Sequence, residues 1–175
     1  MSVLGAHDDA VHGLTWVDPN LVLTGCEDGV LLAHDTRTAG IQWRMKLEHG
    51  ICCLRSVLSA PGKVVVGCTK GYLAVLDTSS RRTLLLERLH NDDVRAVAVA
   101  EQSFRGTDGS RMHTALLSTS FDTTGRVLRL NASLDSISTV ARLAGHTDKV
   151  LCAKFTPLGQ PVTTGADGKV LLWHP

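Results

Sequence analysis

Histidine, threonine and aspartate recur together along this chain in an order that could support acid–base chemistry. Near the C-terminus His146 is followed by Thr163 and Asp167, and comparable sets lie upstream. An imidazole held between a hydroxyl and a carboxylate is the arrangement of a catalytic triad. Catalytic residues, however, are not normally duplicated once per repeat. We therefore interpret these sets as structural hydrogen-bonding groups and predict no catalytic residue among them.

Histidine and cysteine are also the usual transition-metal ligands. The eight histidines are spread along the chain, without the His-x-His or His-x-x-x-His pairs that place two ligands together. The five cysteines lack Cys-x-x-Cys spacing, and an odd count does not suit a disulfide framework. They are Cys26, Cys52, Cys53, Cys68 and Cys152. All lie in apolar, strand-like segments, so we predict small buried core residues in a reducing compartment, with no metal and no cofactor.

The sequence also lacks the common signatures of nucleotide and acyl-transfer enzymes. There is no GxxxxGK[ST], no GxGxxG after a predicted strand and no GxSxG. With 18 basic and 17 acidic residues the net charge of +1 does not steer the chain toward nucleic acid or a membrane. The N-terminus lacks the apolar segment of a signal peptide. We expect a non-enzymatic intracellular protein, cytoplasmic with the nucleus as an alternative, without a specific nucleic-acid or membrane partner.

The elements that position these residues are four repeated units. Their opening histidines are His7, His49, His90 and His146, at spacings of 42, 41 and 56 residues. The first two spacings match the period of about 40–45 residues of four-stranded propeller blades. A polar stretch at residues 101–111 lengthens the third spacing, and we predict that it forms a surface loop.

Each unit consists of short apolar segments rich in valine and leucine, separated by Gly, Pro and Asp turns, which favours β-strands joined by tight hairpins. The predicted strands are 11–17, 21–26, 30–35 and 41–47; 51–58, 63–68, 72–77 and 83–89; 94–100, 114–120, 127–131 and 137–143; and 150–155, 160–164 and 170–173. In the third unit we expect the turn at 122–125 to be two residues longer than its counterparts.

The last unit resembles a repeat of the WD-repeat family. It has Gly145-His146, the run Thr-Thr-Gly-Ala-Asp-Gly and a closing Trp173, and four such units in register extend the resemblance over essentially the whole chain. The resemblance implies a single all-β domain over residues 1–175, a propeller of four WD-type blades of four-stranded antiparallel sheets. The blades would span about 5–47, 48–89, 90–143 and 144–175, the last one lacking its outer strand.

The resemblance also implies a hydrogen-bonded chain of His, Ser or Thr, Asp and Trp in each blade. The last unit supplies His146, Thr163, Asp167 and Trp173; the first supplies His7, Thr24 and Asp28; the third supplies His90, Ser118 and Asp122. His34 replaces the Trp of the first unit, and Leu130 is expected to replace that of the third. The second unit retains only His49, so its blade should depend on packing.

The family implies a protein-interaction scaffold that binds through one end of the propeller and its rim. The expected positions are three and five residues after the opening His and one before the turn Asp. They correspond to Ala10, His12 and Glu27; Thr69; Asp93, Arg95 and Phe121; and Lys149, Leu151 and Ala166. Phe121 has two interpretations: an aromatic interface anchor, or a filler of the space beside Leu130.

Two other functions remain open. His34-Asp35-Thr36-Arg37 resembles the WDxR box of receptors that bring substrates to cullin-type ubiquitin ligases, with His in place of Trp. An enzyme would instead need a pocket with perturbed carboxylates at the channel mouth, for example around Asp92 and Asp93.

Closure of the ring is unresolved by the sequence. The units supply four sets of three inner strands but three outer strands, and residues 1–4 are a candidate for the missing one, as a clasp that closes the ring. Three alternatives follow: a piece of a longer propeller, an open half-ring completed by a second copy or a partner subunit, or a closed four-bladed ring. Because unpaired sheet edges associate, an open ring is not expected to remain monomeric.

Overall fold

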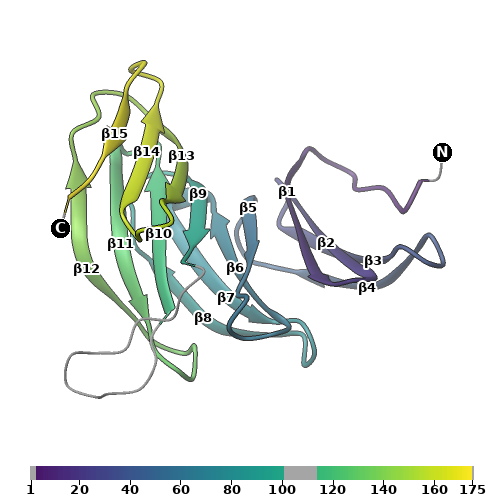
Figure 1. The fold of residues 1–175 in the computed structure, drawn as a ribbon. Helices are drawn as coiled ribbons and strands as arrows, with labels where there is room; N and C mark the ends of the chain where they lie inside the picture. Colours follow the sequence, from purple (N-terminus) through teal and green to yellow (C-terminus); the bar gives the residue numbers. More distant parts are fainter. Residues whose placement is uncertain (1–2, 101–113, 175) are drawn as a thin grey trace.

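The structure is a computed structural model that describes residues 3–100 and 114–174. Within these residues fifteen strands form four antiparallel sheets, each a meander in chain order (Figure 1). Blade 1 contains β1 (Val11–Asp18), β2 (Leu21–Cys26), β3 (Val30–Asp35) and β4 (Gly40–Lys46). Blade 2 contains β5 (Ile51–Ser56), β6 (Lys63–Cys68), β7 (Tyr72–Asp77) and β8 (Arg82–Arg88), with a short turn, η1 (Thr69–Gly71). Blade 3 contains β9 (Val94–Val99), β10 (Thr114–Ser120), β11 (Thr124–Leu130) and β12 (Ile137–Ala144). Blade 4 contains β13 (Val150–Phe155), β14 (Pro161–Gly165) and β15 (Val170–Leu172).

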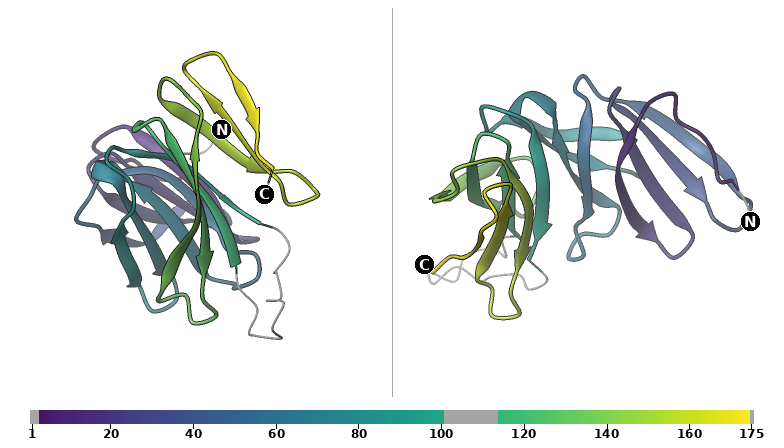
Figure 2. Two further views of the ribbon diagram at one scale, coloured as in Figure 1. Left: turned by 90° about the vertical axis from the view of Figure 1, so that its left-hand side faces the viewer. Right: turned by 90° about the horizontal axis from the view of Figure 1, so that it is seen from above.

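The predicted all-β propeller architecture is confirmed, and the ring is open. The first strand of each blade contacts that of the next, from β1 through β5 and β9 to β13. Seen from above, the blades follow an arc whose two ends carry the two termini (Figure 2). In the described part of the chain, blade 4 has three strands and the other blades have four.

The expected intramolecular clasp is not formed by the described part of residues 1–4. The backbone oxygen of Leu4 lies 3.4 Å from His34 Nδ1, at the blade 1 end of the arc. The physical reason is the incomplete ring: four blades do not bring the start of the chain back to β15. The prediction of a clasp within one chain is therefore wrong for Val3 and Leu4.

The core lies between neighbouring blades, because each strand alternates its side chains between the two faces of its sheet. One cluster joins blades 1 and 2, including Leu23 and Leu54. A second joins blades 2 and 3, including Val75 and Leu116, and a smaller third cluster joins blades 3 and 4. The apolar side chains of each sheet are therefore buried against the neighbouring blade.

The turn of blade 3 differs from the prediction. Ser118 pairs with Arg126, and Leu116 pairs with Leu128, so the turn has the same length as in blade 4 and Leu128 occupies the position of the Trp. The assignment of Leu130 to that position was wrong. Thr123 adopts φ +69° and takes the left-handed place that glycine holds in the other blades. The sequence pattern had placed that role at Gly125, two residues later.

The cysteine prediction holds for four of the five residues. Cys26, Cys52, Cys53 and Cys68 are buried, whereas Cys152 is exposed. Cys152 lies on the face of blade 4 that has no following blade to cover it. The predicted loop at 101–111 lies outside the described residues. Among the described residues, no helix is long and apolar enough to cross a membrane.

Candidate functional site

Blade 4 contains a continuous hydrogen-bonded chain of four side chains. Trp173 Nε1 donates to Thr163 Oγ1 at 2.9 Å, and Thr163 Oγ1 lies 2.9 Å from His146 Nε2. His146 Nδ1 lies 3.0 Å from both carboxylate oxygens of Asp167. The carboxylate accepts a hydrogen bond from Nδ1–H, which leaves Nε2 of the neutral imidazole to accept one from the threonine hydroxyl. Each polar atom therefore has a partner in a site closed to solvent, and the network ties the opening loop to β14, to the β14–β15 turn and to Trp173 directly after β15.

The Asp167 carboxylate is stabilised in its ionised form. Burial alone raises its pKa, but hydrogen bonds from the Thr147 backbone N–H and from His146 outweigh burial and lower the pKa to about 2. This contribution to stability is full above the ordinary pKa of an aspartate, 3.8, and is lost as the pH falls from that value toward 2. A carboxylate of this kind holds a fold together and is not poised to move a proton near neutral pH.

Blade 3 repeats the arrangement without an aromatic end. His90 Nε2 lies 2.9 Å from Ser118 Oγ, and His90 Nδ1 lies 3.1 Å from Asp122 Oδ2. The His90 side chain is fully buried. Burial lowers the pKa of His90, although the neighbouring Asp122 carboxylate opposes that effect. His90 therefore resists protonation when pH falls below the ordinary histidine pKa of 6.5.

Blade 1 has a different network from the one predicted. His7 Nε2 lies 2.7 Å from Thr24 Oγ1, and His34 Nε2 lies 2.8 Å from the same hydroxyl, in the place of the missing indole. Asp28 does not join them: it accepts a hydrogen bond from the Val30 backbone N–H and pairs with Lys46. His7 Nδ1 is buried without a hydrogen-bond partner among the residues described. Blade 1 is thus tied by two histidines through one threonine.

Blade 2 replaces the hydrogen-bonded chain with an aromatic contact. The ring of His49 stacks on Tyr72, with centroids 3.9 Å apart and planes inclined by 17°. Val66 and Leu76 stand at the positions of Thr163 and Trp173, and both are buried. The sequence did not predict that Tyr72 stacks on His49. The one signal for it was that the single tyrosine of the chain stands at the start of β7.

The candidate partner-binding residues lie at the same end of every blade, on a surface that we call the upper face: the opening loops after each histidine and the β2–β3, β6–β7, β10–β11 and β14–β15 turns. One backbone hydrogen bond recurs there in every blade. It runs from Glu27 to Ala10, from Thr69 to Gly50, from Phe121 to Asp93 and from Ala166 to Lys149. This register identifies Gly50 and Cys52 as the blade 2 counterparts, which the sequence had not assigned because its opening after His49 is two residues shorter than in the other units.

Side chains on the upper face also interact within and between blades. His12 Nε2 lies 3.2 Å from Glu27 Oε2 within blade 1. The Asp93 carboxylate accepts a hydrogen bond from the Lys70 backbone N–H of blade 2. The Lys149 ammonium of blade 4 lies 4.7 Å from the centroid of the Phe121 ring of blade 3. The upper face is therefore a continuous surface across neighbouring blades.

The inner positions of this face form a row from four blades: His12, Cys52, Arg95 and Leu151. Arg95 reaches across to blade 2, where its Nη1 donates to the Cys52 carbonyl oxygen at 3.4 Å. Burial raises the pKa of the Cys52 thiol to about 12, so that it stays protonated and unreactive. His12 and Leu151 are exposed. The side chains of this row can therefore contact a partner, and the Cys52 thiol is not available as a nucleophile.

Comparison with known proteins agrees with this repeat geometry. The family described as WD domain, G-beta repeat matches residues 137–174. Over residues 137–174 the chain is therefore similar to a WD repeat. Its relatives include Meiotic fizzy-related protein 1 of Schizosaccharomyces pombe, 26% identical over 96% of this chain and 48% of that protein. Ribosome biogenesis protein YTM1 of Ajellomyces capsulatus is 33% identical over 49% of this chain and 18% of that protein.

The chain spans less than half the length of these two curated relatives. Among solved structures, the computationally designed Ika4 protein superposes with a TM-score of 0.74 at 20% identity, covering 99% of this chain and 96% of Ika4. The designed Ika8 protein superposes with a TM-score of 0.72 at 19% identity, covering 97% of this chain and 47% of Ika8. At these identities the likeness concerns the fold alone.

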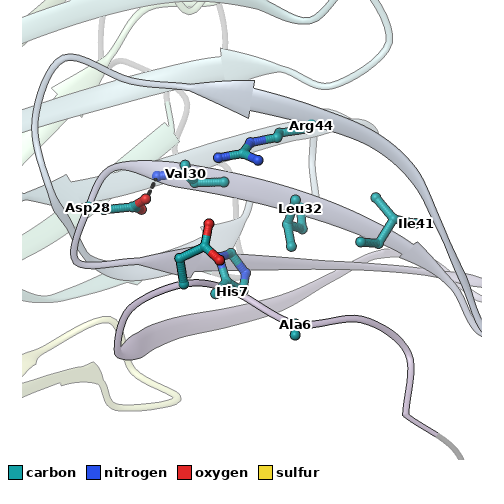
Figure 3. Close-up of a pocket in the computed structure, with 8 residues that line it drawn as sticks. Ala6, His7, Asp28, Val30, Leu32, Ile41 and Arg44 are labelled. Atoms are coloured by element: carbon teal, nitrogen blue, oxygen red, sulfur yellow. Dashed lines mark hydrogen bonds between the residues drawn. The ribbon is translucent and has the colours of Figure 1, made fainter.

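Two small cavities lie away from the upper-face residues. One, of about 120 Å³, lies on blade 1 and is lined by residues that include His7, Asp28 and Arg44 (Figure 3). The other, of about 220 Å³, lies between blades 1 and 2. Asp92 and Asp93, the carboxylates considered for an enzyme, line neither cavity. Within the described residues no group of three histidine, cysteine or acidic side chains is placed to hold a metal ion.

The WDxR-like segment forms a structured turn at the lower end of blade 1. Asp35 is buried, and its carboxylate accepts hydrogen bonds from the Arg37 backbone N–H at 2.8 Å and from Arg37 Nη2 at 2.9 Å. Gln42 Nε2 donates to the same carboxylate at 3.2 Å. The Arg37 side chain is 65% exposed despite this pairing. Asp35 therefore serves the turn, and Arg37 is the residue that a partner could reach.

Proposed function

We propose that this WD-repeat chain is a protein-interaction scaffold that binds a protein or peptide through its upper face. The observation that carries the proposal is the Phe121–Lys149 pair, which joins two blades at 4.7 Å on the surface where the candidate residues of all four blades meet. A rigid face built from several blades orders few side chains on binding, and this favours affinity.

Phe121 is placed to act as the anchor of this face. It is only partly buried, and it stands outside the cluster in which Leu130 packs. The alternative role, filling the space beside Leu130, is thus taken by other side chains of the described core. Lys149 covers the ring with a charge, as expected of an aromatic group that faces water. A partner that displaces Lys149 would gain the apolar ring and leave the charge available to an acidic group.

We predict that Phe121→Ala weakens partner binding without lowering the melting temperature. An aromatic anchor removed from an interface costs about 2 kcal/mol or more of binding free energy, whereas its loss leaves no cavity in the core. The measurement compares proteins that co-purify with tagged wild type and variant, quantified by mass spectrometry, with thermal unfolding of both.

The matched control for Phe121→Ala is Phe155→Ala. Phe155 packs against the cluster between blades 3 and 4, so its truncation should lower the melting temperature by several degrees. A Phe121→Ala variant that melts several degrees lower while retaining its partners would show that Phe121 is a core residue and overturn the anchor role.

A second candidate function is a substrate receptor of a cullin-type ubiquitin ligase. It is supported by the exposure of Arg37 at the edge of the WDxR-like turn. An adaptor of such a ligase should then co-purify with the wild type and be lost with Arg37→Ala. Retention of the adaptor by that variant would eliminate this function and leave the upper-face proposal intact.

The cellular setting that we propose is intracellular, in the cytoplasm or the nucleus, without a cofactor. Four free cysteines buried in the blades suit a reducing compartment. The names of the two relatives refer to meiosis and to ribosome biogenesis, both intracellular processes.

A further inference from the structure

The two ends of the arc carry faces of the kind that are buried everywhere else in the molecule. We call them the first face, on blade 1, and the last face, on blade 4. The first face includes Leu14, Trp16 and Val11, and the last face includes Cys152, Val170 and Leu172, which point away from blade 3. Blades 1 and 4 lie at opposite ends of the arc (Figure 2), and each carries one of these exposed apolar faces.

Position by position, the first face matches the surfaces that bind a preceding blade. Leu14 is 57% exposed, whereas Leu54, its counterpart in blade 2, is fully buried. Val11 is exposed in the same way, whereas its counterparts Ile51 and Val94 are fully buried. The first face therefore has the residue types of a blade interface and no neighbour to fill it.

The last face matches the surfaces that bind a following blade. Val170 is 71% exposed, whereas its counterparts Leu31 and Leu73 are fully buried. Cys152 is exposed, whereas its counterpart Cys53 is buried with its thiol 3.6 Å from the backbone oxygen of Val94 in the next blade. The corresponding contact of Cys152 would be the Val11 carbonyl of another copy.

The N-terminal segment provides a third match. In the inner blades, the strand that precedes the opening His is the outer strand of the blade before it: Leu73 pairs with Glu87, three residues before His90. Gly125 likewise pairs with Leu143, three residues before His146. By the same register Leu4, three residues before His7, belongs beside Val170 of a preceding blade. The edge of β15 is unpaired in the described structure.

We propose that two copies of this chain assemble head to tail into a closed ring of eight blades. The first face of each copy packs on the last face of the other, and the segment around Val3 and Leu4 completes the partner's blade 4 as its fourth strand. The two identical interfaces satisfy one twofold axis along the channel, so the ring closes instead of growing. The assembly is independent of what the upper face binds.

The curvature of the arc supports a second copy as the occupant. The four blades superpose over 97% of this chain but only 47% of the designed Ika8 protein, so a chain about twice as long continues the same fold beyond them. Each copy offers both halves of the missing interface. The cavity on the first face, bordered by Ile41 and Arg44, would be covered by the partner's blade 4 (Figure 3).

Light scattering with size-exclusion chromatography tests the assembly on the 175-residue chain. The wild type should elute with twice the 18.8 kDa mass of one copy. Leu14→Asp and Val170→Asp should each weaken association by at least about 100-fold, because each places a charge in both apolar interfaces of the dimer. Leu58→Asp is the matched control: Leu58 is 71% exposed, equal to Val170, but lies in a turn of blade 2, so this variant should remain dimeric.

Mixing the two interface variants separates head-to-tail from symmetric face-to-face contact. The Leu14→Asp variant keeps an intact last face, and the Val170→Asp variant keeps an intact first face. Together they should form a mixed dimer that neither forms alone, with circular dichroism confirming that both variants are folded. Four outcomes would each overturn the proposal: a wild type with the mass of one copy, a dimer that neither charge weakens, a mass that keeps increasing with protein concentration, or the absence of a mixed dimer.

Discussion

Gly71→Ala should be among the most destabilising single substitutions in the protein, lowering the free energy of unfolding by about 2–5 kcal/mol. Gly71 has φ +83°, a conformation that costs an alanine about 1–2 kcal/mol. A Cβ at this position would also lie 1.9 Å from the His90 carbonyl oxygen. That oxygen is backbone and cannot rotate away, so the link between blades 2 and 3 has to shift.

Gly168→Ala is the matched control for this prediction. Gly168 occupies the equivalent turn of blade 4 with φ +75°, but a Cβ there would meet nothing within 4 Å. It should lose only the conformational cost, about 1–2 kcal/mol. Urea unfolding at one protein concentration compares the two variants. Equal losses would show that the close approach of Gly71 to blade 3 does not contribute.

His90→Ala should lower the free energy of unfolding by about 3–5 kcal/mol, because it removes a fully buried ring and two hydrogen bonds together. Ser118 Oγ would be left buried without its partner. His7→Ala is the comparison: it removes the hydrogen bond to Thr24, and Thr24 keeps its contact with His34, so about 1 kcal/mol is expected.

The same variant changes the pH dependence of stability. Because burial lowers the pKa of His90 in the folded protein, the unfolded state binds a proton first as pH falls below 6.5. Wild-type stability should therefore decline from 6.5 downward, and His90→Ala should remove that part of the decline. A His90→Ala variant that is as stable as His7→Ala, or an unchanged pH profile, would contradict the structural role of the network.

The sequence was most informative where local chemistry decides the structure. The bounds of β2, β3, β6 and β7 match the predicted segments because an Asp-Gly turn separates β2 from β3, a Lys-Gly turn separates β6 from β7, and Pro-containing turns precede β2 and β6. The positions expected relative to the opening His and the turn Asp also included Phe121 and Lys149, which form a contact between blades. They could be found from the sequence because the loops concerned have the same length in these two blades.

The failures arose where a residue takes an unusual role or where the whole arc matters. Thr123 adopts a left-handed conformation that threonine rarely holds, so the turn of blade 3 was read from the later glycine. His34 replaces an indole by contacting the same hydroxyl, which a residue pattern cannot show. The exposure of Cys152 and the location of Leu4 depend on how much of a closed ring the four blades form.

The most direct test of the proposed binding role is a photo-reactive amino acid placed at position 121 and, in a second variant, at position 58 on the opposite end of the blades. Both positions lie within the arc and away from its two ends, so the result does not depend on dimerisation. We expect covalent adducts with a partner protein at position 121 and none at position 58. Adducts at position 58 with none at position 121 would contradict the upper face as the binding surface.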